Sequence, residues 1–233
     1  RALREAGLAD LAEADRLGAA EGSAPIAPEA RAVARAMAAL HDGSADGPAR
    51  ALERLAGTAG PWAASVRATA HYLNREMESA AAVADAILAE WPEHAEARAT
   101  RANARLGIGL ERRARGREGA IEALAGAIDD ARRLERGLAP EALPALLLMR
   151  SAAWLAKADA EEGRGLDPRP SLHEAIADTR SAEAFAPGDV ALAMNAAVAH
   201  RRRGDACADR GEDAEEDLRR AVELSDRVLT AHP

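Results

Sequence analysis

Residues 164–187 read RGLDPRPSLHEAIADTRSAEAFAP, and residues 210–233 read RGEDAEEDLRRAVELSDRVLTAHP. The second stretch matches the first at a shift of 46 residues: an Arg-Gly-x-Asp motif opens both, a leucine and an alanine follow at equal distances, and a proline closes both. The match continues upstream, where Asp205-Ala206 aligns with Asp159-Ala160. Repetition at a fixed period predicts one structural unit that is used more than once, with neighbouring copies stacked on each other.

A shorter form of this pattern occurs further upstream. Each of four prolines is preceded by an alanine at twelve residues and by a small or aliphatic residue at five residues. The alanines are Ala49, Ala80, Ala175 and Ala221, and the prolines are Pro61, Pro92, Pro187 and Pro233. We interpret each occurrence as a helix ended by proline, which cannot continue a helix. Ala120 and Ala127 keep the inner spacing without the proline.

A second signature marks the helix that precedes each of these patterns. It consists of an arginine, a small residue, any residue and an alanine. The copies are Arg35-Ala36-Met37-Ala38, Arg67-Ala68-Thr69-Ala70, Arg101-Ala102-Asn103-Ala104 and Arg150-Ser151-Ala152-Ala153. A fifth copy, Ala196-Ala197-Val198-Ala199, lacks only the arginine. The distance from the small residue to the alanine of the next helix is 12 or 13 residues in the first two copies and 24 in the last two, so the hairpins lengthen toward the C-terminus.

The composition predicts an almost entirely helical protein. Alanine accounts for 64 of the 233 residues, whereas aromatic residues account for 2%. Alanine, leucine, arginine and glutamate favour helices, while strands favour β-branched and aromatic side chains. The single cysteine, Cys207, excludes an intrachain disulfide and a zinc site built from cysteines.

Charge and hydropathy exclude several kinds of partner. The formal net charge of −8 gives no general attraction to nucleic acid or to an anionic membrane surface. No run of 18 apolar residues occurs, and residues 1–5 carry charges where a signal peptide would be apolar. We therefore expect no nucleic-acid or membrane partner and predict a cytoplasmic location. Because the chain begins with arginine, we also expect that it was cut from a longer protein.

The two signatures resemble the tetratricopeptide repeat, a helix-turn-helix unit of about 34 residues with a small residue in its first helix, an alanine in its second helix and a closing proline. The resemblance implies an all-α fold, a right-handed superhelical solenoid of about five hairpins, with lengthened hairpins in the C-terminal units. The chain departs from the family because alanine and leucine replace most of the usual aromatic residues. A pair of short alanine-rich helices cannot bury its apolar face alone, so each hairpin is expected to stack on the next.

We expect two parts in the chain. Residues 1–27 are predicted to form a capping helix and a linker, and residues 28–233 a repeat domain. The repeat units are expected at about 28–61, 61–92, 93–140, 141–187 and 188–233. We expect about eleven helices, and the two arms that meet near Asp167 and near Asp213 should both project beyond the stack. The insert at residues 165–170, followed by a helix, is similar to long-hairpin repeats in the C-terminal tails of large bacterial Ser/Thr protein kinases.

The sequence contains no coherent catalytic, cofactor-binding or metal-binding set. His173-Glu174 matches the start of the zinc-protease helix motif, but Ala177 stands where a second histidine is required. The acidic run from Asp209 to Asp217 lacks the spacing and the central glycine of a calcium loop. The basic run at residues 112–117 lacks aromatic residues on which bases could stack. We therefore predict a protein that is not an enzyme and uses no cofactor or metal ion.

First helices of tetratricopeptide repeats line a concave surface that binds peptides, so the resemblance implies a peptide groove. The candidate groove residues are Met37, Thr69, Tyr72, Asn103, Leu148, Met149, Ala152, Met194, Asn195, Val198, Arg201 and Arg202. Most of them are apolar, and methionine adapts to irregular surfaces, which suits an amphipathic helix or an extended peptide. The alternative interpretation is that Met149 and Met194 pack between the hairpins as core residues.

The favoured hypothesis is a noncatalytic interaction scaffold that binds a peptide or helix segment of a protein partner. The alternative hypothesis is an intramolecular regulatory or dimerising tail of a larger signalling enzyme, such as a Ser/Thr protein kinase. Homo-oligomerisation is left open by the sequence. What the gene encodes upstream of Arg1 distinguishes the two hypotheses.

Overall fold

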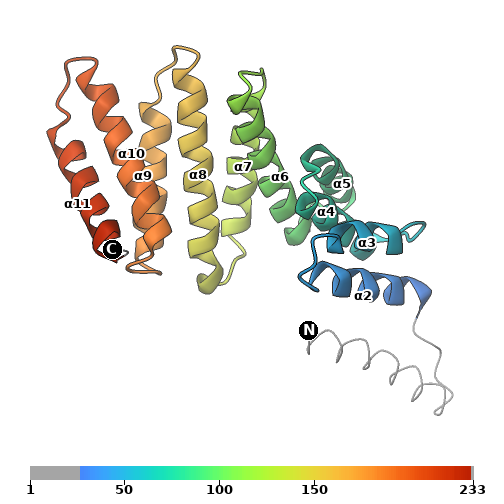
Figure 1. The fold of residues 1–233 in the computed structure, drawn as a ribbon. Coiled ribbons are helices and arrows are strands. Elements are labelled where there is room, and N and C mark those ends of the chain that lie inside the picture. The colour runs from blue at the N-terminus through green and yellow to red at the C-terminus, as the bar shows by residue number, and fades with distance from the viewer. Residues whose placement is uncertain (1–26, 232–233) are drawn as a thin grey trace. The chain divides into compact units, whose positions relative to one another are not determined.

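The computed structural model describes residues 27–231, and within this range the chain is all-helical (Figure 1). Ten α-helices and one short 3-10 helix account for its regular structure, and the described residues contain no strand. This confirms the expected all-α fold. The predicted capping helix in residues 1–26 lies outside the described residues.

The helices form two compact units, which divide between Ala104 and Arg105 within helix α6. The N-terminal unit contains two complete helical hairpins and the first half of α6. Its helices are α2 (Pro28–Leu40), α3 (Gly47–Arg54), α4 (Pro61–Leu73), α5 (Met77–Glu90) and the beginning of α6 (Ala95–Ala114). The hairpins stack because α4 packs against both α2 and α3, and Leu55 lies fully buried between them.

The C-terminal unit continues the same alternation of first and second helices. After the remainder of α6 it contains α7 (Ala120–Glu135), the 3-10 helix η1 (Pro140–Ala142), α8 (Leu143–Glu162), α9 (Arg169–Glu183), α10 (Val190–Ala208) and α11 (Glu215–Ala231). Each helix from α7 onward packs against the next one in the chain, as Figure 1 shows for α8 to α11. The first helices α8 and α10 also contact each other directly, so this unit is a stack of hairpins and not a row of separate pairs.

The two Arg-Gly-x-Asp motifs form the same turn twice. Gly165 and Gly211 both have a φ of 70°, in the left-handed region that ends helices without strain only for glycine. Two residues later, Asp167 and Asp213 each accept a hydrogen bond from the backbone N–H two positions ahead, at 3.1 and 3.0 Å, where the next helix begins. The motif therefore ends one helix and starts the next.

The lengthened hairpins grow in their first helices only. The first helices α6, α8 and α10 contain 20, 20 and 19 residues, whereas α2 and α4 contain 13 each. This adds nearly two turns, or about 10 Å of helix. The second helices α9 and α11, with 15 and 17 residues, remain close to the 14 residues of α5. We expected both helices of each lengthened hairpin to project beyond the stack. This was wrong, because the first helices take up most of the added residues and the loops before α9 and α11 take up most of the rest.

Buried alanines mark the contacts between helices. Ala80, Ala175 and Ala221 of the proline-ended pattern are buried, with exposed fractions of 0, 0 and 6%. The first occurrence was misread: Ala49 is exposed, and Ala51 and Leu55 form the buried face of α3 instead. Proline at position 61 begins α4, where its missing N–H would have no partner in any case, so the spacing from Ala49 was coincidental.

Candidate functional site

The first-helix signature has the same pattern of burial in every copy. The small second residue is buried, as are most of the alanines at the fourth position: Ala36, Ala68, Ala102, Ser151, Ala197, Ala70, Ala104, Ala153 and Ala199. The third residue between them is always more exposed, most of all Met37 and Val198, at 46 and 39%. Each first helix thus has one position per repeat that is less buried than its neighbours: exposed in α2 and α10, and half-buried in α4, α6 and α8.

The signature arginine lies on the opposite side of the same helix. Arg67 of α4 donates to the carbonyl of Thr58 at 2.8 Å, and Arg101 of α6 pairs with Asp85 of α5 at 2.7 Å. Arg150 of α8 reaches second helices on both sides, as described below. Residues two apart in a helix are about 200° apart around its axis. The third position therefore faces away from the second helices, and we call this side of α2, α4, α6, α8 and α10 the first-helix face.

On the first-helix face of the C-terminal unit, α8 and α10 are joined by side-chain hydrogen bonds. Asn195 of α10 donates to the hydroxyl of Ser151 at 3.0 Å, and this hydroxyl donates in turn to the Leu148 carbonyl at 2.8 Å. Arg202 donates to the carbonyl of Leu155 at 3.4 Å and pairs with Glu162 at 2.6 Å. Three of the candidate groove residues, Leu148, Asn195 and Arg202, thus take part in the contacts between α8 and α10.

The apolar candidates on this face are accessible to different degrees. Met194 is 52% exposed, so it is not a core residue. Met149 and Ala152 are half-buried, and Leu148 packs against a cluster that contains Leu147 and Leu192. The core interpretation therefore fails for Met194 and holds in part for Leu148.

The basic candidates differ in their partners. Arg201 is exposed and has no ion-pair partner among residues 27–231. Arg202 shares Asp159 with Arg113 of α6, so two arginines from neighbouring first helices converge on one carboxylate of α8. Burial and the nearby charge of Arg113 lower the pKa of Arg202. Only Arg201 keeps its guanidinium free to meet a partner.

The remaining candidates lie in the N-terminal unit. Met37 is 46% exposed and Tyr72 is half-buried. The polar side chains bond within their own helices, because Thr69 donates to the Ser65 carbonyl at 3.1 Å and Asn103 donates to the Ala99 carbonyl at 3.0 Å. Because these two side chains already donate within their own helices, a partner would contact this part of the first-helix face mainly through the apolar groups of Met37 and Tyr72.

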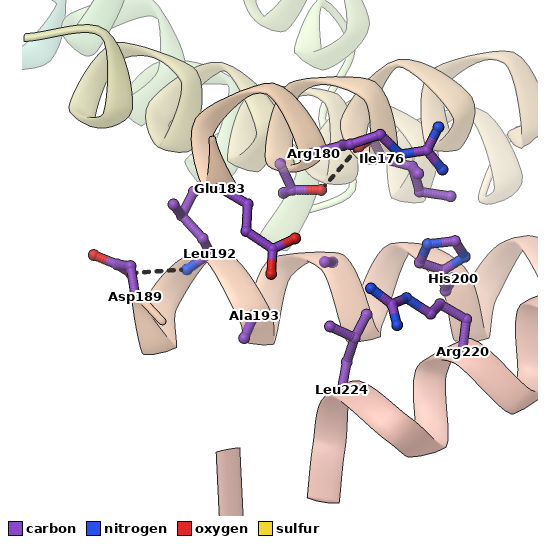
Figure 2. Close-up of a pocket in the computed structure, with 11 residues that line it drawn as sticks. Ile176, Arg180, Glu183, Asp189, Leu192, Ala193, His200, Arg220 and Leu224 are labelled. Atoms are coloured by element: carbon purple, nitrogen blue, oxygen red, sulfur yellow. Dashed lines mark hydrogen bonds between the residues drawn. The ribbon is translucent and has the colours of Figure 1, made fainter. Parts of the chain in front are cut away.

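The second-helix side of the C-terminal unit contains a pocket that the sequence analysis did not find. It has a volume of about 80 Å³ and lies between α9, α10 and α11 (Figure 2). Figure 2 shows Arg180 and Arg220 reaching it from α9 and α11, while α10 contributes Ala196 and His200. The fifth signature has Ala196 where the others have arginine, and this smaller side chain was the feature of the sequence that could have predicted the pocket.

The polar groups beside the pocket form a buried network. Asp217 pairs with His200 at 2.7 Å and with Arg203 at 2.6 Å. Burial of Asp217 opposes its ionisation, but the hydrogen bonds from Arg203 and His200 prevail and lower its pKa. These contacts fix α10 to α11 and use up the donors that a ligand would need, so we treat the network as structural.

The motifs that resembled chemical sites are dispersed in the structure. His173 is exposed and accepts a hydrogen bond from Arg203 at 3.3 Å, while Cys207 is half-buried. Across the described range, no three histidine, cysteine or acidic side chains gather closely enough to hold a metal ion. None of the helices between residues 27 and 231 combines the length and apolar character needed to cross a membrane.

Comparisons with known proteins bear on the fold. No protein-family model matches the chain, and no curated protein matches it in sequence. Among solved structures the chain is similar to one described as "MamA RS-1 ArsTM double mutant", with a TM-score of 0.56 and 16% sequence identity. The match covers 85% of this chain and 95% of that one. MamA is a tetratricopeptide-like helical protein, so the similarity supports an all-α helical-repeat fold for this chain.

Proposed function

We propose that this protein is a noncatalytic cytoplasmic scaffold that binds a peptide or helix segment of a protein partner on its first-helix face. The observation that carries the proposal is the third position of the signature, which in each first helix is less buried than its two neighbours and is exposed at Met37 and Val198. Within the C-terminal unit, where the first helices α8 and α10 contact each other, the equivalent positions Ala152 and Val198 offer a partner segment successive contacts.

The chemistry of the face favours an amphipathic segment. On α10, Met194, Val198 and Arg201 follow one another at helical spacing, and the two apolar side chains are 52 and 39% exposed. Exposed methionine and valine reward apolar contact, and methionine adjusts to partners of different shape. Arg201 beside them favours an acidic residue next to the apolar residues of the segment.

A peptide-display selection against the full chain tests this proposal. Peptides that are enriched on the wild-type protein should bind Met194→Glu and Val198→Glu at least about tenfold more weakly, because the carboxylate replaces an apolar contact and competes with the peptide's acidic residue for Arg201. Phe185→Glu is the matched control, since Phe185 is 51% exposed but belongs to no first helix and lies between α9 and α10. Met194 and Val198 are exposed, so a charge at either position should leave the helical circular dichroism signal unchanged.

Two results would contradict the proposal. One is the enrichment of peptides whose binding falls in Phe185→Glu but not in Met194→Glu or Val198→Glu. The other is a selection in which no peptide binds the wild-type chain better than it binds the Met194→Glu variant.

A second candidate function is that of a regulatory or dimerising tail of a larger signalling enzyme such as a Ser/Thr protein kinase. It is favoured by the lengthened first helices α8 and α10, because long hairpins are the feature that this chain has in common with such tails. The full-length coding sequence tests it: a kinase domain encoded upstream supports the tail, and a start codon directly before Arg1 contradicts it.

A further inference from the structure

Helix α11 carries an apolar stripe that is partly exposed among the described residues, with only Leu218 packed against Gly204 of α10. Leu218, Val222 and Leu229 of α11 are 37, 60 and 66% exposed, and Ser225 between them is also exposed. Successive members are four, three and four residues apart, which places all four on one line along the helix. We call these four residues the α11 stripe.

The 46-residue repeat shows what this stripe corresponds to. The equivalents of Leu218, Val222 and Ser225 on α9 are Leu172, Ile176 and Thr179, whereas Leu229 takes the place of the half-buried Glu183. Leu172, Ile176 and Thr179 are buried, with exposed fractions of 0, 4 and 3%, and α9 packs against the following first helix, α10. The α11 stripe therefore corresponds to the surface of α9 that packs in the stack. Three of its four side chains are apolar, as a surface that a further helix could cover requires.

The spacing of the α11 stripe is that of a coiled-coil seam. If Val222 and Leu229 take the a positions of a heptad, Leu218 and Ser225 take the d positions, and Arg219 and Asp226 the e positions. The g positions on the other flank are Ala221, which is buried, and Val228, which is half-buried. The only charges beside the seam thus lie on one flank and have opposite signs.

We propose that the α11 stripe is an interface between two copies of this chain, which pair through antiparallel α11 helices. In an antiparallel pair the e positions of the two helices face each other, so Arg219 meets Asp226 of the partner subunit, and the reverse pair forms by symmetry. Neither Arg219 nor Asp226 forms an ion pair with another described residue, so both are available. A parallel pair would instead place Asp226 opposite Ala221 and Arg219 opposite Ala214 of the partner subunit.

The contact is small, and the dimer is accordingly weak. Three apolar side chains and a serine per helix form its core, over a helix of 17 residues. Interfaces of this size belong to the transient class. We expect dissociation between about 10 µM and about 500 µM, within the range of analytical ultracentrifugation. This interface is separate from the proposed peptide-binding face, and either can fail without the other.

Sedimentation equilibrium of the full chain is the first test. The wild-type mass should rise with concentration from the 24.4 kDa of one chain toward twice that value. Val222→Asp and Leu229→Asp should raise the dissociation constant at least about tenfold with an unchanged helical signal, because both sites are more than half exposed in the monomer. Leu166→Asp, at a site that is 52% exposed in the α8–α9 loop, is the matched control and should dimerise like the wild type.

A charge exchange tests the orientation. Arg219→Asp places two acidic side chains on the flank, and Asp226→Arg places two basic ones there, so each variant alone should be monomeric at concentrations where the wild type dimerises. An equimolar mixture of the two should form a heterodimer, since opposite charges then face each other at both sites. A wild-type chain that stays monomeric up to about 500 µM would overturn the proposal. So would a dimer that Val222→Asp and Leu229→Asp leave intact, or a mixture of the charge variants that does not associate.

Discussion

The hairpins α8–α9 and α10–α11 have the same register but fill their interiors differently. In the first, Arg150 of α8 meets Asp178 of α9, and the 46-residue shift places Ala196 and Leu224 at these two positions in the second. The same shift replaces the buried Trp154 by His200. One hairpin therefore has a charged pair where its neighbour has two apolar side chains.

The charged pair lies in the interior of its hairpin. Arg150 donates two hydrogen bonds to Asp178, at 2.8 and 2.6 Å, and one to Glu135 of α7 at 2.5 Å. The side chains of Arg150 and Asp178 are 9 and 8% exposed. Burial raises the pKa of Asp178 against the opposing effect of Arg150. For Arg150, burial alone would lower the pKa, but the bonds to both carboxylates raise it above its ordinary value.

The second hairpin shows that this pair is not required for the fold. Ala196 and Leu224 line the pocket of about 80 Å³ between α9, α10 and α11, and the helices still stack around it. Buried ion pairs contribute little net stability when apolar residues can replace them, but they are costly to break singly. We infer that the signature arginines Arg67, Arg101 and Arg150 add local links between helices and that the alanine contacts carry the stacking.

The largest expected effect is that of Arg150→Ala. It leaves the Asp178 carboxylate buried without its cation, which should lower the free energy of unfolding by about 3–5 kcal/mol. Urea unfolding followed by circular dichroism measures this change. Arg220→Ala removes an arginine beside the pocket that is 40% exposed, and it should cost less than about 0.5 kcal/mol. Similar losses in both variants would show that the buried pair has no special role.

The next prediction concerns a double variant that gives the α8–α9 hairpin the interior residues of the α10–α11 hairpin. Arg150→Ala combined with Asp178→Leu reproduces the residues of the α10–α11 hairpin, and no buried charge is left unpaired. The double variant should regain most of the stability lost in Arg150→Ala, to within about 1.5 kcal/mol of the wild type in the same urea titration. A double variant no more stable than Arg150→Ala would mean that the two interiors are not interchangeable.

A smaller gain is expected from filling the pocket. Ala196→Met should raise the free energy of unfolding by about 1 kcal/mol, because the longer side chain occupies space that Arg150 occupies in the preceding hairpin. Ala191→Met, at an exposed position of the same helix, is the control and should leave the midpoint of urea unfolding unchanged. Loss of stability in Ala196→Met would indicate that Arg220 and Leu224 already close the pocket.

The smallest expected effect on stability comes from Asp167, in the Arg-Gly-x-Asp turn that occurs in both hairpins. Hydrogen bonds from Arg169 lower the pKa of Asp167 from 3.8 to about 2. Because this pKa is lowered in the folded state, the stabilising contribution is complete above pH of about 4 and is lost as the pH falls toward about 2. Asp167→Asn should flatten the pH dependence of stability within that window, measured by urea unfolding at several pH values. An unchanged slope between these pH values would contradict the assignment.

Much of the fold could be predicted because it is repeated. The Arg-Gly-x-Asp motif and the small-x-Ala register recur at fixed spacing, and each recurrence in the structure has the same turn or the same buried face. Ala49 was misread because an isolated alanine-to-proline distance carries no information on which face of a short helix is buried. The choice of which arm lengthens was also undetermined, because the added residues lie between the two signatures.

The contacts between repeats were the part that the sequence did not reveal. Arg113, Asp159 and Arg202 meet only because α6, α8 and α10 are neighbours in the C-terminal unit. The pocket depends on a missing side chain at Ala196 together with Arg180 and Arg220 from two other helices. Such features require the distances between helices, which periodicity alone does not supply.

In each first helix the third residue of the signature is more accessible than the residues on either side of it, and the proposed binding face depends on this register. Thiol labelling tests it directly in a Cys207→Ser background, which removes the single native cysteine. Ala152→Cys and Val198→Cys should react at least about a hundredfold faster than Ser151→Cys and Ala199→Cys, whose parent residues are 0% exposed and become accessible only by local opening. Equal rates within either neighbouring pair would contradict the register and, with it, the proposed binding face.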